Sequence, residues 1–149
     1  MKTMYHNLKA LKTIILVTAI FLLTVSCEVD DLIGNGVIAE IEGEWDVDEE
    51  SEIFGKSAKK STLGTYVVYI SADPDNSNGI IIDNFYNVGI SVKANVGGNS
   101  ITIPNQNAED GYSVYGSGTI SGNRNTINLS YTVNDGSTQD DHCTAVYTR

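Results

Sequence analysis

The chain has 149 residues, with 19 acidic against nine basic residues and a net charge of −10 at neutral pH. So acidic a protein lacks the Lys and Arg clusters that bind phosphate backbones, and nucleic acid is therefore excluded as a partner. Its length leaves room for one ordinary hydrophobic core, which favours a single domain.

The first 26 residues have the composition of an export signal. A segment with three lysines precedes an apolar run from Thr13 to Val25, and Cys27 follows shortly after it. As a helix, this run of 13 residues would span only about 20 Å, whereas the apolar core of a bilayer is about 30 Å thick. The pattern resembles the lipobox of bacterial lipoproteins. We therefore expect residues 1–26 to be a lipoprotein signal peptide and Cys27 to be lipidated, with a simple secretory signal as the alternative.

Residues 27–39 are acidic and rich in small residues, so we expect an acidic flexible tether. Glu28, Asp30 and Asp31 lie directly behind the cysteine, which resembles the signal that sends some Bacteroidota lipoproteins to the outer face of the outer membrane. The expected location is thus the outer membrane, lipid-anchored and displayed at the cell surface. A solvated linker is the alternative interpretation.

Cys27 and Cys143 are the two cysteines of the chain. If Cys27 carries lipid, Cys143 has no partner for an intramolecular disulfide. The domain must then be stable through burial of its core, which is feasible at this size.

From residue 40 onward, apolar and polar residues alternate in short segments separated by Gly, Asn, Asp and Ser. This period of two is typical of strands that bury one face and expose the other. The predicted strands are Glu40–Val47, Thr65–Ser71, Gly79–Asn87, Gly89–Val96, Ser100–Ile103, Tyr112–Ile120, Thr126–Val133 and Cys143–Arg149. Convincing helical periodicity is absent after the signal, so we expect little helix.

Eight short strands with mostly short links favour an all-β fold over residues 40–149, an eight-stranded antiparallel up-and-down barrel. Closure removes the strand edges that would otherwise aggregate. A two-sheet β-sandwich is the alternative, because the same pattern permits it. The one long connection, Asp48–Leu63, is expected to form either a lid over a barrel mouth or a mobile surface loop.

Several short motifs support a family comparison. Gly43-Glu44-Trp45 resembles the Gly-x-Trp signature of lipocalins, in which the Trp plugs one barrel end beneath an Arg from a late strand. The segments 101–106 and 116–122 and the ending Cys143–Tyr147 resemble small Bacteroidota lipoproteins described as lipocalin-like or calycin-like. The resemblance implies a lipocalin-like barrel closed by Trp45 and Arg149. The usual lipocalin C-terminal helix has no counterpart in this sequence.

An eight-stranded barrel can be filled by its own side chains or can hold one small ligand. The candidate pocket-lining residues are Phe85, Val92, Tyr112 and Tyr131. Such residues suit an apolar or sugar-like ligand, or they pack as plain core. The predicted function is an outer-membrane lipoprotein that binds such a ligand or an envelope protein. A filled, rigid accessory module of an envelope complex is the alternative.

Enzymatic chemistry has little support in the sequence. His142 is the only histidine after the signal, which excludes a multi-His metal site within one chain. Adjacent strand residues point to opposite faces, so His142 and Cys143 should diverge rather than form a dyad. A strip of acids with a period of two is expected to face water, opposite Trp45; it comprises Glu40, Glu42, Glu44, Asp46 and Asp48. We expect no catalytic residues, no cofactor and no metal.

Overall fold

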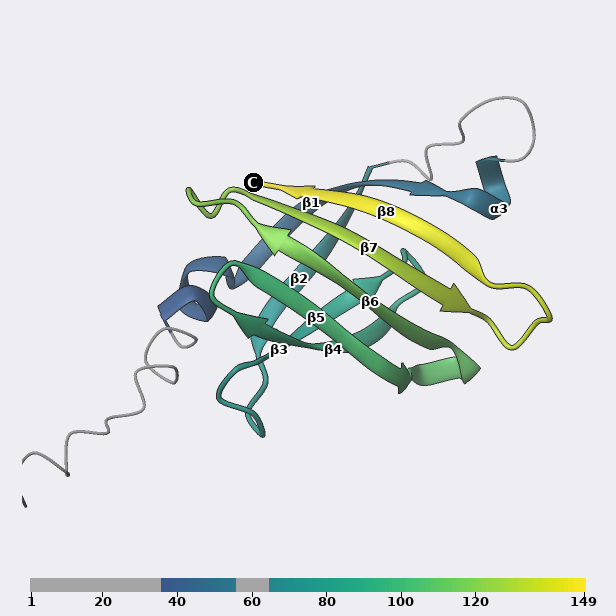
Figure 1. Ribbon diagram of the computed structural model, residues 1–149, viewed down its shortest axis with the longest axis horizontal. Helices are drawn as coiled ribbons and strands as arrows, with labels where there is room; N and C mark the ends of the chain where they lie inside the picture. The colour runs from purple at the N-terminus through teal and green to yellow at the C-terminus, as the bar shows by residue number, and fades with distance from the viewer. Residues whose placement is uncertain (1–35, 56–64) are drawn as a thin grey trace, which may run out of the picture.

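The computed structural model describes residues 36–55 and 65–149. Eight antiparallel strands wrap around a common interior (Figure 1). They are β1 (Gly43–Ser51), β2 (Tyr66–Ala72), β3 (Gly79–Phe85), β4 (Ile90–Gly97), β5 (Ser100–Asn107), β6 (Ser113–Ile120), β7 (Thr126–Asn134) and β8 (Asp141–Thr148). Short helical elements, α3 (Glu52–Gly55) and η1 (Glu109–Gly111), lie in the connections that follow β1 and β5.

Each strand pairs with the next along the chain, and β8 returns to pair with β1 (Figure 1). In this closing pair Asp46 lies opposite Thr148, and Ser51 lies opposite Cys143. Every strand of the described residues thus pairs with a neighbour on both sides, as closure of a barrel requires. The predicted all-β, eight-stranded up-and-down barrel is confirmed, and the sandwich is excluded.

Side-chain alternation builds the core. Along β1, Trp45, Val47 and Glu49 are buried, whereas Glu44 and Asp46 between them are exposed. The inward apolar residues of all the strands form one cluster. Fully burying a Val, Leu, Ile or Phe side chain contributes about 1.5–3 kcal/mol, so this cluster is the main source of stability. Cys143 is a free thiol buried within the cluster.

The chain enters the barrel differently from the prediction, which began the first strand at Glu40. Residues 36–41 are helical, and Val37, Ile38 and Ile41 bury their side chains in the core. Their spacing is that of one helical face, and Gly43, with a φ of +119°, marks the change to β1. Residues 36–39 of the predicted tether thus belong to this helical turn, and the remainder lies outside the described residues. No helix within 36–55 or 65–149 has the length and apolar character needed to cross a membrane.

Several further boundaries also differ from the prediction, most of all the ends of β5 and β1. β5 continues past Pro104 to Asn107, and the pairing with β6 shifts register between Ile103 and Gln106. Such an irregularity tolerates the missing N–H of a proline inside a strand. β1 extends to Ser51, so the connection predicted from Asp48 begins only at α3; residues 56–64 lie outside the described part of the chain.

Glycines on the inward face of β6 allow large side chains on β7 to fill the interior. Gly116 pairs with Tyr131, and Gly118 pairs with Leu129. A Cβ added at Gly116 would lie 2.5 Å from the Cβ of Tyr131. The absence of a side chain at this position is therefore what admits the Tyr131 ring to the core.

The two ends of the barrel are built differently. At one end, named here the closed end, the indole of Trp45 is buried and its Nε1 donates to the Ile41 carbonyl at 2.9 Å. The Arg149 guanidinium lies 4.5 Å from the centre of the Trp45 ring and donates to the carbonyls of Glu40 and Glu42. These contacts join the last strand to the helical turn 36–41. The opposite end, named the open end, holds the connections after β1, β3, β5 and β7.

Candidate functional site

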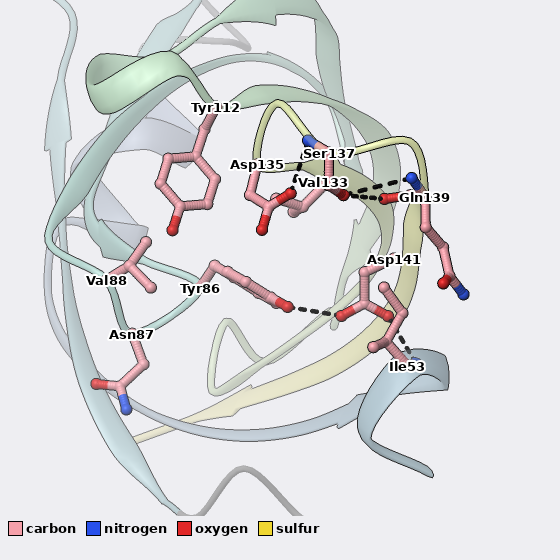
Figure 2. Close-up of a pocket in the computed structure, with 10 residues that line it drawn as sticks. All are labelled: Ile53, Tyr86, Asn87, Val88, Tyr112, Val133, Asp135, Ser137, Gln139 and Asp141. Carbon is pink, nitrogen blue, oxygen red and sulfur yellow. Dashed lines mark hydrogen bonds between the residues drawn. The ribbon is translucent and has the colours of Figure 1, made fainter. Parts of the chain in front are cut away.

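A hollow of about 270 Å³ lies at the open end of the barrel (Figure 2). It collects side chains from α3, from the connections that follow β3, β5 and β7, from the end of β7 and from the start of β8. Its lining consists of Ile53, Tyr86, Asn87, Val88, Tyr112, Val133, Asp135, Ser137, Gln139 and Asp141. Apolar and aromatic groups thus surround the hollow, and a few polar groups converge on it, as is typical of small-molecule sites.

The Tyr86 ring is positioned by an unusual turn between β3 and β4. Asn84, Tyr86 and Asn87 have φ values of 61°, 57° and 56°, in the left-handed region. Asn tolerates this region, whereas for a bulky residue such as Tyr it is a genuine outlier that costs about 1–3 kcal/mol. The Asn84 side chain supports the turn by donating to the Val67 carbonyl and accepting from the Gly89 N–H. This strained backbone directs the Tyr86 hydroxyl toward Asp141.

Asp141 forms part of the wall of the hollow near β1 and is only 3% exposed. Its carboxylate accepts hydrogen bonds from the Ser51 hydroxyl at 2.5 Å, the Tyr86 hydroxyl at 2.6 Å and the Ile53 N–H at 3.1 Å (Figure 2 shows the last two). Burial acts to raise the pKa of Asp141, but these hydrogen bonds outweigh it and hold the pKa below its usual range. The open end therefore carries a buried carboxylate that stays ionised at neutral pH.

A second carboxyl group, that of Glu49, is fully buried inside the barrel. The Tyr66 hydroxyl donates to its Oε2, while its Oε1 has no hydrogen-bond partner among the described residues. Desolvation is the main cause that raises the pKa of Glu49, and repulsion from Asp141 adds to it. The pKa values of the two carboxyls are thus shifted in opposite directions, so that Asp141 keeps its charge and Glu49 favours its protonated form.

Two tyrosine hydroxyls in the same interior also lack partners. Within residues 36–55 and 65–149, neither the Tyr131 nor the Tyr147 hydroxyl has a partner at good hydrogen-bonding geometry, although both residues are buried; the Tyr131 hydroxyl is near enough to Glu49 to act against the rise of its pKa. Both groups interact electrostatically with Glu49. A buried polar group without a partner costs about 1–3 kcal/mol, so this set of atoms is a polar region inside an otherwise apolar core.

Cys143 lies on the inward face of β8 and interacts with both Asp141 and Glu49. Burial is the main cause that raises the pKa of its thiol, and the two carboxyls raise it further. His142 is exposed on the outer face, and its Nδ1 lies 2.9 Å from the Thr132 hydroxyl. The side chains of His142 and Cys143 therefore lie on opposite faces of the strand. Among the described residues, no three His, Cys, Asp or Glu side chains are grouped so as to hold a metal ion.

The predicted pocket residues are divided between the core and the open end. Phe85, Val92 and Tyr131 are buried in the core, and the rings of Phe85 and Tyr131 pack with their centres 4.5 Å apart. Tyr112 lines the hollow. Trp45 and Arg149 meet at the closed end. Cys27 lies outside the described residues.

Glu49, Tyr86 and Asp141 are the site residues that the sequence analysis missed. Glu49 lies four residues after Trp45 in β1, so strand alternation places it on the same inward face as Trp45. The alternating acids on either side of it face outward. Asp141 has the parity of Cys143, and beginning the last strand two residues earlier would have found it. For Tyr86, which depends on the left-handed turn, the sequence carries no comparable signal.

No model of a known protein family matches the chain, and no curated protein matches it either. What the structure supports is an eight-stranded, all-antiparallel closed barrel consistent with a lipocalin-like fold.

Proposed function

We propose that this protein is a lipid-anchored component of the bacterial outer membrane, displayed at the cell surface, whose barrel binds a small molecule in the hollow at its open end. The single observation that carries the binding proposal is this hollow. It is lined by two tyrosines and several apolar side chains and contains a buried carboxylate. The opposite end is filled by Trp45 and held by Arg149.

The packing of the interior supports a ligand at the open end rather than deep in the barrel. Phe85, Val92 and Tyr131 are at most 3% exposed and contribute to one continuous core. A volume of about 270 Å³ is slightly below the usual range for small-molecule sites, roughly 300–1,000 Å³. The hollow thus suits a compact ligand with an apolar or sugar-like body that contacts Tyr86 and Tyr112.

The experiment that tests binding is native mass spectrometry of residues 28–149 after incubation with an extract of the host envelope. We expect a discrete added mass. It should be lost in Tyr112→Ala, which removes a ring from the hollow, and kept in Tyr69→Ala, which removes an exposed ring from the outer face of β2. Absence of any adduct, or its equal loss in both variants, would contradict binding in this hollow.

Support for the anchor comes from the sequence, in which Cys27 follows a basic segment and an apolar run. Two acyl chains would give a stable anchor, whereas one chain binds only marginally. Cells grown with radiolabelled palmitate should label the wild-type protein and leave Cys27→Ala unlabelled. Protease added to intact cells should then digest the labelled protein if it is displayed outside. Label retained by Cys27→Ala would overturn the anchoring proposal.

A second candidate function is that of a rigid accessory module that acts through its outer surface. The observation that favours it is the outer face of β1 and β2, where exposed acids lie beside exposed apolar side chains. In register, Glu44 pairs with Tyr69 and Asp46 pairs with Val67. Crosslinking in intact cells should recover one specific protein, and recovery should fail in a Tyr69→Ala, Val67→Ser variant. Recovery of no specific protein would count against this function.

A further inference from the structure

The charge of the open-end hollow indicates the chemistry of its ligand. Among its lining residues are two acids, Asp135 and Asp141, and no Lys, Arg or His. The Asp135 carboxylate accepts the Ser137 N–H at 3.0 Å, and hydrogen bonds from Ser137 lower the pKa of Asp135. Both acids are therefore ionised at neutral pH, and the hollow is negative.

Asp141 is the more informative of the two because it is buried. Its hydrogen bonds keep it ionised, so it presents a full negative charge in the wall of the hollow, where an opposite charge would be attracted to it. The three donors that bind its carboxylate are a serine hydroxyl, a tyrosine hydroxyl and a backbone N–H, all of them neutral. They satisfy hydrogen bonding but supply no positive charge.

The basic side chains of the described residues are all engaged elsewhere. Lys93 pairs with Asp73 at 2.9 Å, and Arg124 pairs with Glu40 at the same distance. Arg149 lies over Trp45 at the closed end. Within residues 36–55 and 65–149, the charge of Asp141 thus has no basic partner.

We propose that the ligand of the open-end hollow is a small organic ammonium ion, whose positive charge is held by Asp141 and whose apolar body lies against Tyr86 and Tyr112. This inference rests on the proposed function, since it assigns a chemical class to the ligand of the same site. A cation near tyrosine faces gains further attraction from the aromatic ring. The Tyr86 hydroxyl donates to Asp141, and this hydrogen bond holds the Tyr86 ring and the Asp141 carboxylate in a fixed position relative to each other.

The unpartnered atoms deeper in the barrel agree with this assignment. Glu49 lies beyond Asp141, is fully buried, and leaves its Oε1 without a partner among the described residues. Because Glu49 favours its protonated form, Asp141 carries the charge of this pair, and a cation in the hollow would be attracted to Asp141. An anionic ligand would instead face the carboxylates of Asp135 and Asp141, with no basic residue among the lining residues to compensate them.

The test compares three probes of similar size and shape: 2-phenylethylammonium, neutral 2-phenylethanol and anionic 3-phenylpropanoate. Each is titrated at pH 7 into residues 28–149, which contain the whole barrel and its core, and binding is followed by two-dimensional NMR. We expect the ammonium ion to bind about tenfold more tightly than the alcohol, which corresponds to about 1.4 kcal/mol. The carboxylate should bind more weakly than either. Amide shifts should concentrate at Val88, Tyr112 and Gln139.

Two variants identify the carboxylate that is responsible for the preference for the ammonium ion. Asp141→Asn should reduce the preference for the ammonium ion over the alcohol from about tenfold to less than twofold while retaining alcohol binding. Asp46→Asn, which removes the same charge from the outer face of β1, should keep the preference. If Asp141→Asn fails to fold, the three-probe comparison on the wild-type protein still decides whether the hollow prefers a cation.

The possible outcomes separate the two proposals. Equal binding of ammonium ion and alcohol at the hollow would overturn the inference and leave a ligand site in place. If no probe shifts any residue of the hollow and the envelope extract yields no adduct, the proposed function itself is refuted. A preference for the ammonium ion that survives in Asp141→Asn would assign the charge recognition to another group and overturn the role of Asp141.

Discussion

The buried carboxyl of Glu49 predicts a specific dependence of stability on pH. Its pKa is raised in the folded protein, mainly by desolvation, so the folded state holds a proton that the unfolded state releases. The contribution of this group is fully present below its pKa in the unfolded chain, about 4.3, and is lost as pH rises through the raised folded pKa. Between these two values the free energy of unfolding should fall by up to about 1.4 kcal/mol per pH unit.

Glu49→Gln tests this without changing the size of the side chain. The amide oxygen can still accept from the Tyr66 hydroxyl, and the amide N–H can donate to an unpartnered tyrosine hydroxyl, as a protonated carboxyl can. Urea unfolding of both proteins is measured from pH 4.5 to pH 8. The free energy of unfolding of the variant should be close to that of the wild type at pH 4.5 and should increasingly exceed it as pH rises.

A matched control is Glu44→Gln, which removes an exposed acid from the outer face of the same strand. Its stability should stay within about 0.5 kcal/mol of wild type, with the same pH profile. If the curves for Glu49→Gln and wild type are parallel across the pH range, Glu49 does not take up a proton on folding and the reasoning fails.

Three further substitutions, one of them with a matched control, test the packing by urea unfolding at pH 7. Trp45→Ala should cost about 3–5 kcal/mol, because it empties the closed end and leaves Arg149 without its ring, and an unchanged midpoint would contradict that role. Gly116→Ala should cost about 1–3 kcal/mol by overlap with Tyr131, whereas Gly97→Ala, whose Cβ would meet nothing within 4 Å, should be close to neutral. Tyr147→Phe removes a buried hydroxyl without a described partner and should be neutral or stabilising; a loss above about 1 kcal/mol would show that the hydroxyl is hydrogen-bonded.

The barrel could be predicted because the patterns that determine it lie within short segments of the sequence. Alternation along each strand sets which face is buried, and short polar turns set which strands are neighbours. The same alternation predicts that the outer face of β1 is acidic, and Glu44, Asp46 and Asp48 are indeed exposed. The helical turn 36–41 was missed because three apolar residues in so short a segment fit either a helix or a strand.

The hollow was less predictable because loops make it. Alternation indicates that Phe85 and Tyr131 point inward, but whether their rings leave a cavity depends on how the whole interior packs. Here large rings fill the interior, and the hollow is displaced to the open end. Its shape depends on the left-handed conformations of Tyr86 and Asn87, which no short sequence pattern specifies.

The entry of the chain at the closed end also determines how the molecule would stand on a membrane. Residues 36–41 pack beside Trp45, and residue 36 is only nine positions after Cys27. A fully extended chain reaches at most about 3.3–3.6 Å per residue, so a lipid at Cys27 would hold the closed end within about 30 Å of the bilayer. The hollow, at the far end of the barrel axis, would then face the surrounding medium and meet solutes before they meet the lipid surface.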